Sequence, residues 1–333
     1  MKIIRWEFWP YWLFYIPVYV KYLYLGVKAR SFVFFSAANP GMLMGGFSSY
    51  SKFEVLDRLS SAYKPKTFLV GPDEDKIKEI LNSNGIDFPF ILKPDVGERG
   101  FGVAKIDNEA ELKIYLSKAD PVLVLQEYVN YPLEIGVMYH RIPGEAKGKI
   151  SSVVIKEFLS TTGDGKSTLS ELFRKGERSK LYIDLLEKRF RHRLDEILPK
   201  GKHLELESIG NHCRGTKFLN GNHLINNELL DVFDKISHNI GNHFFGRYDL
   251  RVASLEELYK GETIRIMEVN GANSEPAHIY DPSMKLIAAY RSLFEHWQNL
   301  YDVSIVNHRK GIDYMPLGKA IRLLRSHIKH RNS

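Results

Sequence analysis

Residues 246–251 (GRYDLR) and 264–271 (IRIMEVNG) decide the fold, because both runs predict strands and a polar, glycine-containing connection joins them. Glu268 and Asn270 are two residues apart, so their side chains leave the same face of a strand. Asp249 can face them from the neighbouring strand. Two carboxylates and an amide oxygen suit Mg²⁺ (or Mn²⁺) that bridges phosphate groups. The alternative is a solvated outer face, but apolar flanks indicate a strand with one covered face: Ile264, Ile266 and Val269.

The composition is that of a globular protein, with 333 residues of which 44% are hydrophobic and 26% charged. This allows one large core or a few small subdomains. The single cysteine, Cys213, makes a disulfide framework impossible, so we expect a cytoplasmic protein. The net charge of +7 favours anionic partners such as nucleotides or anionic lipid. Nucleic acid is not expected, because no recognition motif accompanies the charge.

Residues 8–20 (FWPYWLFYIPVYV) form an apolar, aromatic run that Lys21 interrupts. Pro10 and Pro17 argue against a clean membrane span, and no cleavage site indicates a signal peptide. Trp and Tyr favour the boundary between lipid and water. Two main interpretations stay open: an element lying on the inner membrane surface, or a segment packed on the protein's own core or in a homodimer contact. A true transmembrane helix is the remaining alternative.

Residues 319–331 predict a basic amphipathic helix, with Ile321, Leu324 and Ile328 at helical spacing on one face. It could bind acidic lipid or dock by its apolar side. Four histidines, at 212, 223, 238 and 243, match no zinc spacing, and Cys213 beside His212 does not form a nucleophilic pair.

Between the termini, strands and helices alternate, which predicts a layered α/β or α+β fold. Residues 31–36 resemble a strand and lead into a glycine-rich loop at 39–46. We expect further strands at 67–70, 88–92, 122–127, 134–141 and 150–158, and helices at 51–59, 73–82, 108–118, 168–196 and 227–243. The predicted segments are an aromatic lead (1–30), a short N-terminal α/β region (31–87), a main domain (88–300) and a basic tail (301–333).

Residues 91–102 (ILKPDVGERGFG) place Lys93 at the end of a strand, before a loop that contains Gly97, Gly100 and Gly102. Glycines let backbone N–H groups approach phosphate oxygens, and Lys93 adds a positive charge. The pattern is neither a P-loop nor a dinucleotide fingerprint, and an ordinary turn is the alternative.

Residues 122–129 (VLVLQEYV) form a strand that enters a linker, whose backbone can bind the edge of an adenine ring. The nearby Glu134 suits two ribose hydroxyls. The alternative is a buried strand that carries an exposed acid.

In this order, the motifs resemble the ATP-grasp superfamily of ligases, in particular D-alanine–D-alanine ligase-like and cyanophycin synthetase-like members, over roughly residues 88–282. The resemblance implies an α+β fold in which two α/β subdomains clasp ATP, here with a shortened N-terminal domain. By resemblance, Arg247 stabilises charge in the transition state. The other implied roles are phosphate binding by Lys93 and the glycine loop, adenine binding by Gln126, Glu127 and Val129, ribose binding by Glu134, and magnesium binding by Asp249, Glu268 and Asn270.

A second local match, residues 162–172 (TGDGKSTLSEL), is similar to the Gly-Asp-Gly stretch of cyanophycin synthetase-like and bifunctional glutathione synthetase-like enzymes. We expect a structural turn with Ser167 or Thr168 as helix cap. Lys156 is a candidate second phosphate contact. Residues 214–216 (RGT) lie where relatives have a phosphate or substrate contact.

The family chemistry implied is an ADP-forming ligation of a small carboxylate to an amine through an acylphosphate. The basic and aromatic termini suggest a cell-envelope or membrane-associated precursor as substrate. A kinase that phosphorylates a hydroxyl and an ATP-binding module without turnover are the alternatives.

Overall fold

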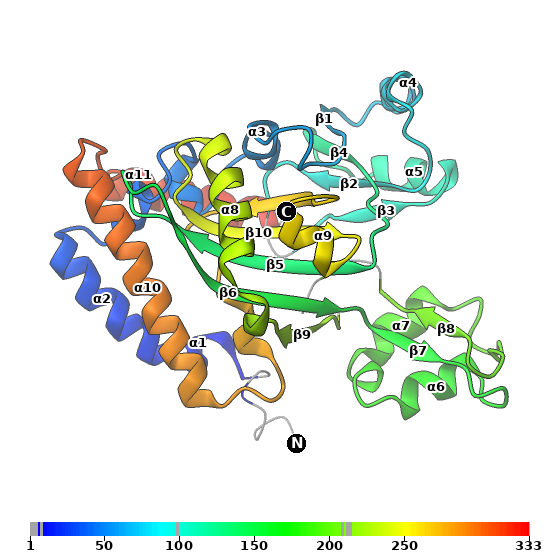
Figure 1. Ribbon diagram of the computed structural model, residues 1–333. Coiled ribbons are helices and arrows are strands. Elements are labelled where there is room, and N and C mark those ends of the chain that lie inside the picture. The colour runs from blue at the N-terminus through cyan, green and yellow to red at the C-terminus, as the bar shows by residue number, and fades with distance from the viewer. Residues whose placement is uncertain (1–5, 7–8, 98–99, 208–209, 211–214, 333) are drawn as a thin grey trace. The chain divides into compact units, whose positions relative to one another are not determined.

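The computed structural model describes residues 6, 9–97, 100–207, 210 and 215–332, and it divides into two compact units. Unit 1 comprises residues 1–155 and 219–333, and unit 2 comprises residues 156–218. Helices and strands are mixed along the chain (Figure 1), so the predicted α+β class is confirmed.

The first sheet of unit 1 has four antiparallel strands in the order β1 (Thr67–Val70), β4 (Leu123–Glu127), β2 (Phe90–Pro94) and β3 (Ala104–Ile106). Helices α4 (Glu74–Asn84) and α5 (Glu109–Leu116) pack on it around the buried side chains of Ile77, Leu92, Leu112 and Leu125. Asp73 and Asn108 cap the two helices by accepting backbone N–H groups, which fixes where each begins. The elements predicted here are confirmed within a few residues, and β3 is an addition.

The second sheet has five strands in the order β11 (Arg265–Asn270), β10 (Phe245–Val252), β5 (Leu133–His140), β6 (Lys149–Glu157) and β9 (Lys217–Asn220). One face packs against α3 (Lys52–Asp57), α8 (Asn227–Ile240) and α9 (Leu255–Lys260), and its core includes Tyr248, Leu250, Ile266 and Val269. These residues alternate with polar ones along β10 and β11, so the polar side chains lie on the other face. That face carries the candidate site.

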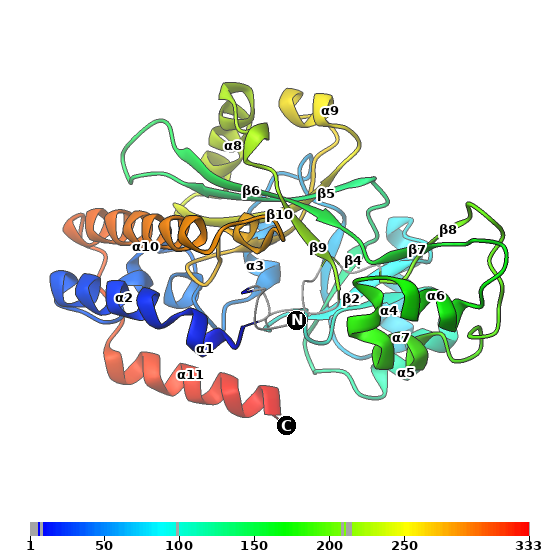
Figure 2. The ribbon, with the colours of Figure 1, turned by 90° about the horizontal axis from the view of Figure 1, so that it is seen from below.

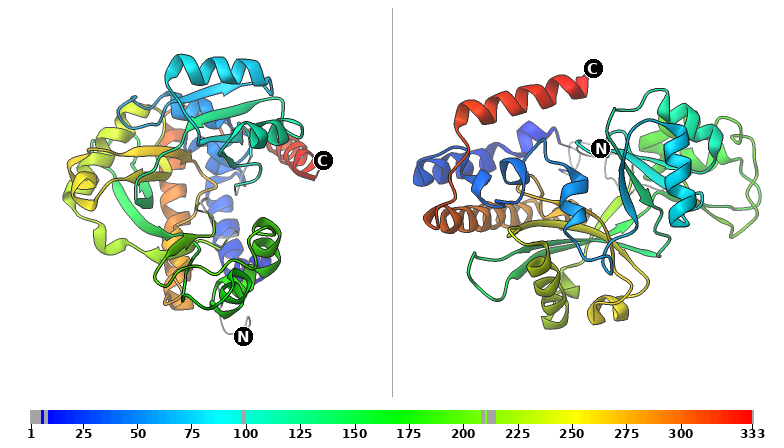
Figure 3. Two further views of the ribbon diagram at one scale, coloured as in Figure 1. Left: turned by 90° about the vertical axis from the view of Figure 1, so that its right-hand side faces the viewer. Right: turned by 90° about the horizontal axis from the view of Figure 1, so that it is seen from above.

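The two ends of the chain form a helical layer within unit 1: α1 (Tyr11–Phe14), α2 (Ile16–Ala29), α10 (Leu286–Arg309) and α11 (Leu317–Asn332). Helix α2 lies between α10 and α11 in the views from below (Figure 2) and from above (Figure 3, right), and residues of all three helices share one buried cluster. In the part of the chain that is described, none of the helices has the length and apolar character needed to cross a membrane. The sequence analysis missed α10, which begins at Leu286 and has no side-chain hydrogen bond from the preceding residue, Lys285, to cap it.

The predicted strand at 31–36 is wrong, because these residues include the 3₁₀ turn η2 (Phe34–Ala37). Phe34 and Phe35 are buried there, and Phe34 contacts Tyr301 of α10 edge to face. Packing therefore overrides the β-propensity of the aromatic residues. The glycine loop that follows contains η3 (Leu43–Gly46), and a Cβ at Gly46 would come within 2.7 Å of Gly271 Cα.

Unit 2 contains β7 (Ser160–Thr162), β8 (His203–Glu205), α6 (Leu169–Lys175), η4 (Ser179–Tyr182) and α7 (Ile183–Arg189) around a small core of its own. The single helix predicted over 168–196 is wrong, because Gly176 is extended and ends α6. Asp164 makes the expected turn by accepting the backbone N–H groups of Lys166 and Ser167. Thr168 and Glu171 form a reciprocal capping box at the start of α6.

Candidate active site

The polar face of β10 and β11 brings four side chains together. Arg247 pairs with Asn270, and Asp249 pairs with Glu268, in the antiparallel register. Residues directly opposite each other in such a ladder project from the same face. The sheet-face cluster that the spacing of these residues predicts is therefore formed.

Asp249 is the most buried member of this cluster, with 5% of its surface exposed. It accepts hydrogen bonds from Arg247 Nε and Nη2, both at 3.1 Å, and from Asn270 Nδ2 at 3.0 Å. Tyr50 donates its hydroxyl to Asn270 Oδ1 at 3.2 Å. The amide oxygen of Asn270 therefore faces Tyr50, and a turn of the amide would be needed before it could join the carboxylates as a ligand.

Glu268 differs from Asp249, because its half-buried carboxylate makes no hydrogen bond or ion pair with any residue that the structure describes. Among the same residues, no three His, Cys, Asp or Glu side chains converge as a metal set. Magnesium needs few protein ligands, since phosphate oxygens and water complete its octahedron. The opposed carboxylates of Asp249 and Glu268 therefore fit such an ion when a nucleotide supplies the other oxygens.

Lys93 connects the four-stranded sheet to this cluster. Its buried ammonium donates to Gln126 Oε1 at 3.1 Å and to the carbonyl of Met267 at 3.0 Å. Met267 is the extra residue of a β-bulge, because Asp249 pairs with Glu268 while Leu250 pairs with Ile266. The bulge leaves the Met267 carbonyl outside the regular ladder, where Lys93 can reach it.

Burial lowers the pKa of Lys93 from its ordinary value of 10.5 to about 8. The carboxylates of Glu268, Asp249 and Asp95 raise this pKa, and the ammonium of Lys52 lowers it. The nearby carboxylates thus do not fully offset the cost of burying the positive charge of Lys93. A bound phosphate would offset this cost further and raise the pKa again.

The loop that follows Lys93 is fixed by Lys52, which the sequence analysis missed. The Lys52 ammonium donates to the carbonyls of Pro94, Asp95 and Gly97 at 3.4, 3.3 and 2.5 Å. Ser51 caps α3 and also donates to Asp95 Oδ1 at 3.0 Å, so the start of α3 is attached to the loop. The Ser51 cap indicated only a helix, and nothing local showed that Lys52 would turn inward.

Two glycines of this loop occupy the left-handed region of backbone conformation. Gly100 and Gly102 have φ angles of +70° and +68°, which residues that carry a side chain rarely adopt. A Cβ at Gly102 would also lie 2.6 Å from Pro94 Cγ. Residues 98–99 of the predicted phosphate loop lie outside the described residues.

The residues of the predicted adenine hinge form hydrogen bonds with other residues of the protein. Gln126 holds Lys93 and also donates to Thr67 Oγ1 at 3.1 Å, while Glu127 accepts from the backbone N–H of Lys66 at 3.1 Å. The Val129 carbonyl accepts a hydrogen bond from an arginine. A cavity of about 470 Å³ opens beside the hinge, lined by Gly85, Ile86, Asp87, Phe88, Pro89, Lys105, Glu127, Tyr128 and Asn130.

Glu134, the predicted ribose ligand, is 5% exposed and forms an ion pair with Arg251 at 2.9 Å. Arg251 also donates to the Val129 carbonyl at 2.7 Å. The acid is therefore buried and paired, rather than exposed. Its role toward a ribose stays a prediction, and it requires Glu134 to share or exchange this partner.

The remaining predicted residues belong to unit 2. Lys156 lies at the end of β6, with its ammonium 5.9 Å from the centre of the Phe218 ring. The carbonyls of Gly215 and Thr216 accept hydrogen bonds from Arg178 at 2.7 and 3.0 Å. His212, Cys213 and Arg214 lie outside the described residues.

Comparison with known proteins gives matches to solved structures only, since no family model and no curated protein matches the chain. The VanG D-Ala:D-Ser ligase from Enterococcus faecalis is 16% identical, with a TM-score of 0.43 over 75% of this chain and 61% of that one. D-alanine–D-alanine ligase from Bacillus anthracis is 15% identical, with a TM-score of 0.43 over 78% of this chain and 69% of that one. A bifunctional glutathione synthetase from Pasteurella multocida is 15% identical, with a TM-score of 0.38 over 77% and 38%.

Each of these solved structures is at most 16% identical to this chain, and each TM-score lies below 0.5. The chain spans less than two thirds of the VanG ligase and of the glutathione synthetase.

Proposed function

We propose that this chain is an ATP-dependent carboxylate–amine ligase that forms ADP by way of an acylphosphate. One observation carries the proposal. Asp249 and Glu268 oppose each other on paired strands, and the Lys93 ammonium donates a hydrogen bond to the carbonyl of Met267, the residue next to Glu268. Two acids that can share a divalent ion thus lie beside a buried cation that can hold phosphate oxygens. This is the charge arrangement that a bound triphosphate requires.

Each residue of the cluster has a proposed task. Lys93 binds the α- and β-phosphates, and the glycine loop supplies backbone N–H groups. Asp249 and Glu268, with Asn270 after a turn of its amide, would hold Mg²⁺, which neutralises charge on the β- and γ-phosphate oxygens when bound. Arg247 donates to Asp249 in this structure and lies on the same face, so it can stabilise the charge that develops on the transferred phosphoryl group.

The test is ADP release with pools of amino acids, peptides and cell-envelope precursors as substrates. Glu268→Gln removes one ligand charge and should lower ADP release by roughly a hundredfold or more. Glu262→Gln is the matched control, because Glu262 is exposed on the connection between β10 and β11 and is not part of either strand. Equal turnover in the two variants would refute the assignment.

The same phosphate-binding residues could serve a kinase that phosphorylates a hydroxyl, because they position ATP and leave the acceptor undefined. Trapping with hydroxylamine separates the two reactions, since it captures an acylphosphate and leaves a phosphate ester intact. An ATP-binding module without turnover would release no ADP with any pool. We favour the ligase, because the order of the motifs resembles that of ATP-grasp ligases, and the basic and aromatic termini suggest an envelope or membrane-associated substrate.

A further inference from the structure

The outward face of α2, continued by Trp12 of α1, is apolar along its whole length. Ile16, Val20, Leu23 and Val27 follow helical spacing and are 49%, 65%, 53% and 68% exposed. Trp12 is 65% exposed, and Tyr19 and Tyr24 are 44% and 59% exposed. We call these seven side chains the α2 face.

The opposite side of α2 already has a partner. Val18 and Leu25 are buried, and the Tyr22 ring lies 5.2 Å from that of Trp297 on α10. A helix on the surface of a globular protein normally turns polar residues outward once its apolar stripe is packed. Helix α2 is apolar on both sides, and a continuous exposed apolar surface of this kind marks an interaction site.

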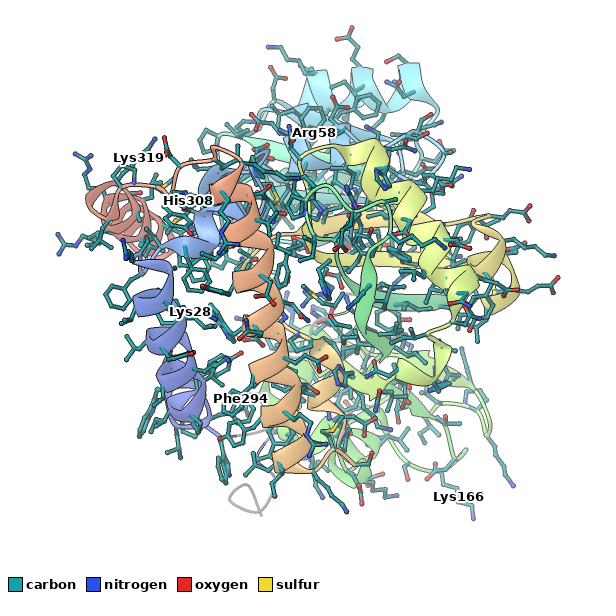
Figure 4. All side chains as sticks on the ribbon, turned by 60° about the vertical axis from the view of Figure 1, so that its left-hand side comes forward. Lys28, Arg58, Lys166, Phe294, His308 and Lys319 are labelled. Atoms are coloured by element: carbon teal, nitrogen blue, oxygen red, sulfur yellow. The ribbon has the colours of Figure 1, made fainter. Side chains whose placement is uncertain are left out.

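Basic side chains border the α2 face, and the helices α1, α2 and α11 contain no acidic residue. The segments 11–29 and 317–332 contain no Asp or Glu, whereas the whole chain has 40. On the α10 side, Lys21 donates to Gln298 Oε1 at 2.9 Å, and Lys28 lies 5.0 Å from the centre of the Tyr301 ring (Figure 4).

On the other side lies α11, whose Ala320 and Leu324 pack into the cluster that contains Leu25. Three basic side chains of α11 are exposed: Lys319, Arg322 and Arg325. Figures 2 and 3 place α2 and α11 together on the side of unit 1 away from α8 and α9.

We propose that the α2 face and the basic side chains of α11 form a docking surface for an anionic phospholipid membrane. Aliphatic side chains would enter the boundary between headgroups and acyl chains, where Trp12, Tyr19 and Tyr24 are also favoured. The lysines and arginines at the border would contact lipid phosphates. A second copy of the chain fits less well, because a symmetric contact would bring these acid-free basic helices together.

Vesicle flotation tests this surface with the full chain. We compare vesicles made of equal parts phosphatidylcholine and phosphatidylglycerol with vesicles of phosphatidylcholine alone. The unaltered protein should float with the anionic vesicles and much less with the neutral ones. The variant Arg322→Gln with Arg325→Gln should bind the anionic vesicles more weakly, by roughly fivefold for each charge removed.

The apolar part is tested by the double variant Val20→Ser with Val27→Ser, which should lose most binding. Its matched control is Ile114→Ser on α5, because Ile114 is 66% exposed but lies on another helix, and this variant should bind normally. The α2 face shares no residue with the ATP site. ADP release without lipid and thermal unfolding are therefore measured for every variant to check that it is folded. If the protein releases no ADP, thermal unfolding remains as the check, and flotation can still be measured.

Three results would overturn the proposal. The first is no flotation with anionic vesicles, and the second is flotation that the Val20 and Val27 changes leave intact. The third is a dimer in lipid-free solution that these two changes abolish, which would make the α2 face a contact between copies of the chain.

Discussion

Replacement of Lys93 by methionine should remove ATP binding and yet stabilise the protein. Lys93 is buried, and its pKa in the folded protein is about 8 instead of 10.5. That difference corresponds to roughly 3 kcal/mol of free energy that the fold spends on keeping the lysine charged below pH 8. Methionine has a similar shape without the charge, so Lys93→Met releases this free energy.

Part of the gain is offset, because Lys93 also donates hydrogen bonds to Gln126 and Met267. Each of these two hydrogen bonds contributes about 0.5–1.5 kcal/mol, so the net increase in the free energy of unfolding at neutral pH should be roughly 0–2 kcal/mol. The gain should shrink as the pH rises. Between about 8 and 10.5 the unfolded chain retains a proton that the folded protein has released, so the wild-type protein becomes more stable there while the variant does not.

The assay is urea unfolding, followed by tryptophan fluorescence, at pH values below 8 and approaching 10.5. ATP binding is measured by titration on the same samples. Lys118→Met is the control, because Lys118 is exposed on the same sheet-and-helix layer and should change neither quantity. A variant that is less stable at neutral pH, or a stability difference that does not vary with pH, would refute the reasoning about Lys93.

Two further predictions concern the same sheet face. Arg251→Met should destabilise the protein by about 3–5 kcal/mol in urea unfolding, because it removes the arginine that forms an ion pair with the buried carboxylate of Glu134. Adding Glu134→Gln should recover much of the loss, and a double variant as unstable as the single one would contradict this. Gly136→Ala should lower ADP release and cost about 1–3 kcal/mol of stability, since its Cβ would lie 3.0 Å from Asp249 Oδ1 and 2.8 Å from Val154 Cγ1; wild-type stability and turnover would show that the sheet has more room than the structure gives it.

The sequence was most informative where local rules operate. The helices expected at 73–82 and 108–118 begin one residue before the observed α4 and α5, and their starts are fixed by a local interaction, since Asp73 and Asn108 accept backbone N–H groups there. The period of two along β10 and β11 placed Asp249, Glu268 and Asn270 on one face. Helix α10 was not predicted, because no side chain caps its start and because packing against α2 and η2 holds it in place.

What the amino-acid sequence by itself determined was the set of charges on the polar sheet face, because strand alternation is a property of the backbone. Only the tertiary structure decided which of these side chains form ion pairs and hydrogen bonds with one another. It paired Glu134 with Arg251, turned the Asn270 amide toward Asp249 and brought Lys52 to the loop after Lys93. These contacts join segments distant in the chain, and burial makes an unpaired charge or amide costly, so the choice of partners depends on which groups the fold removes from water together.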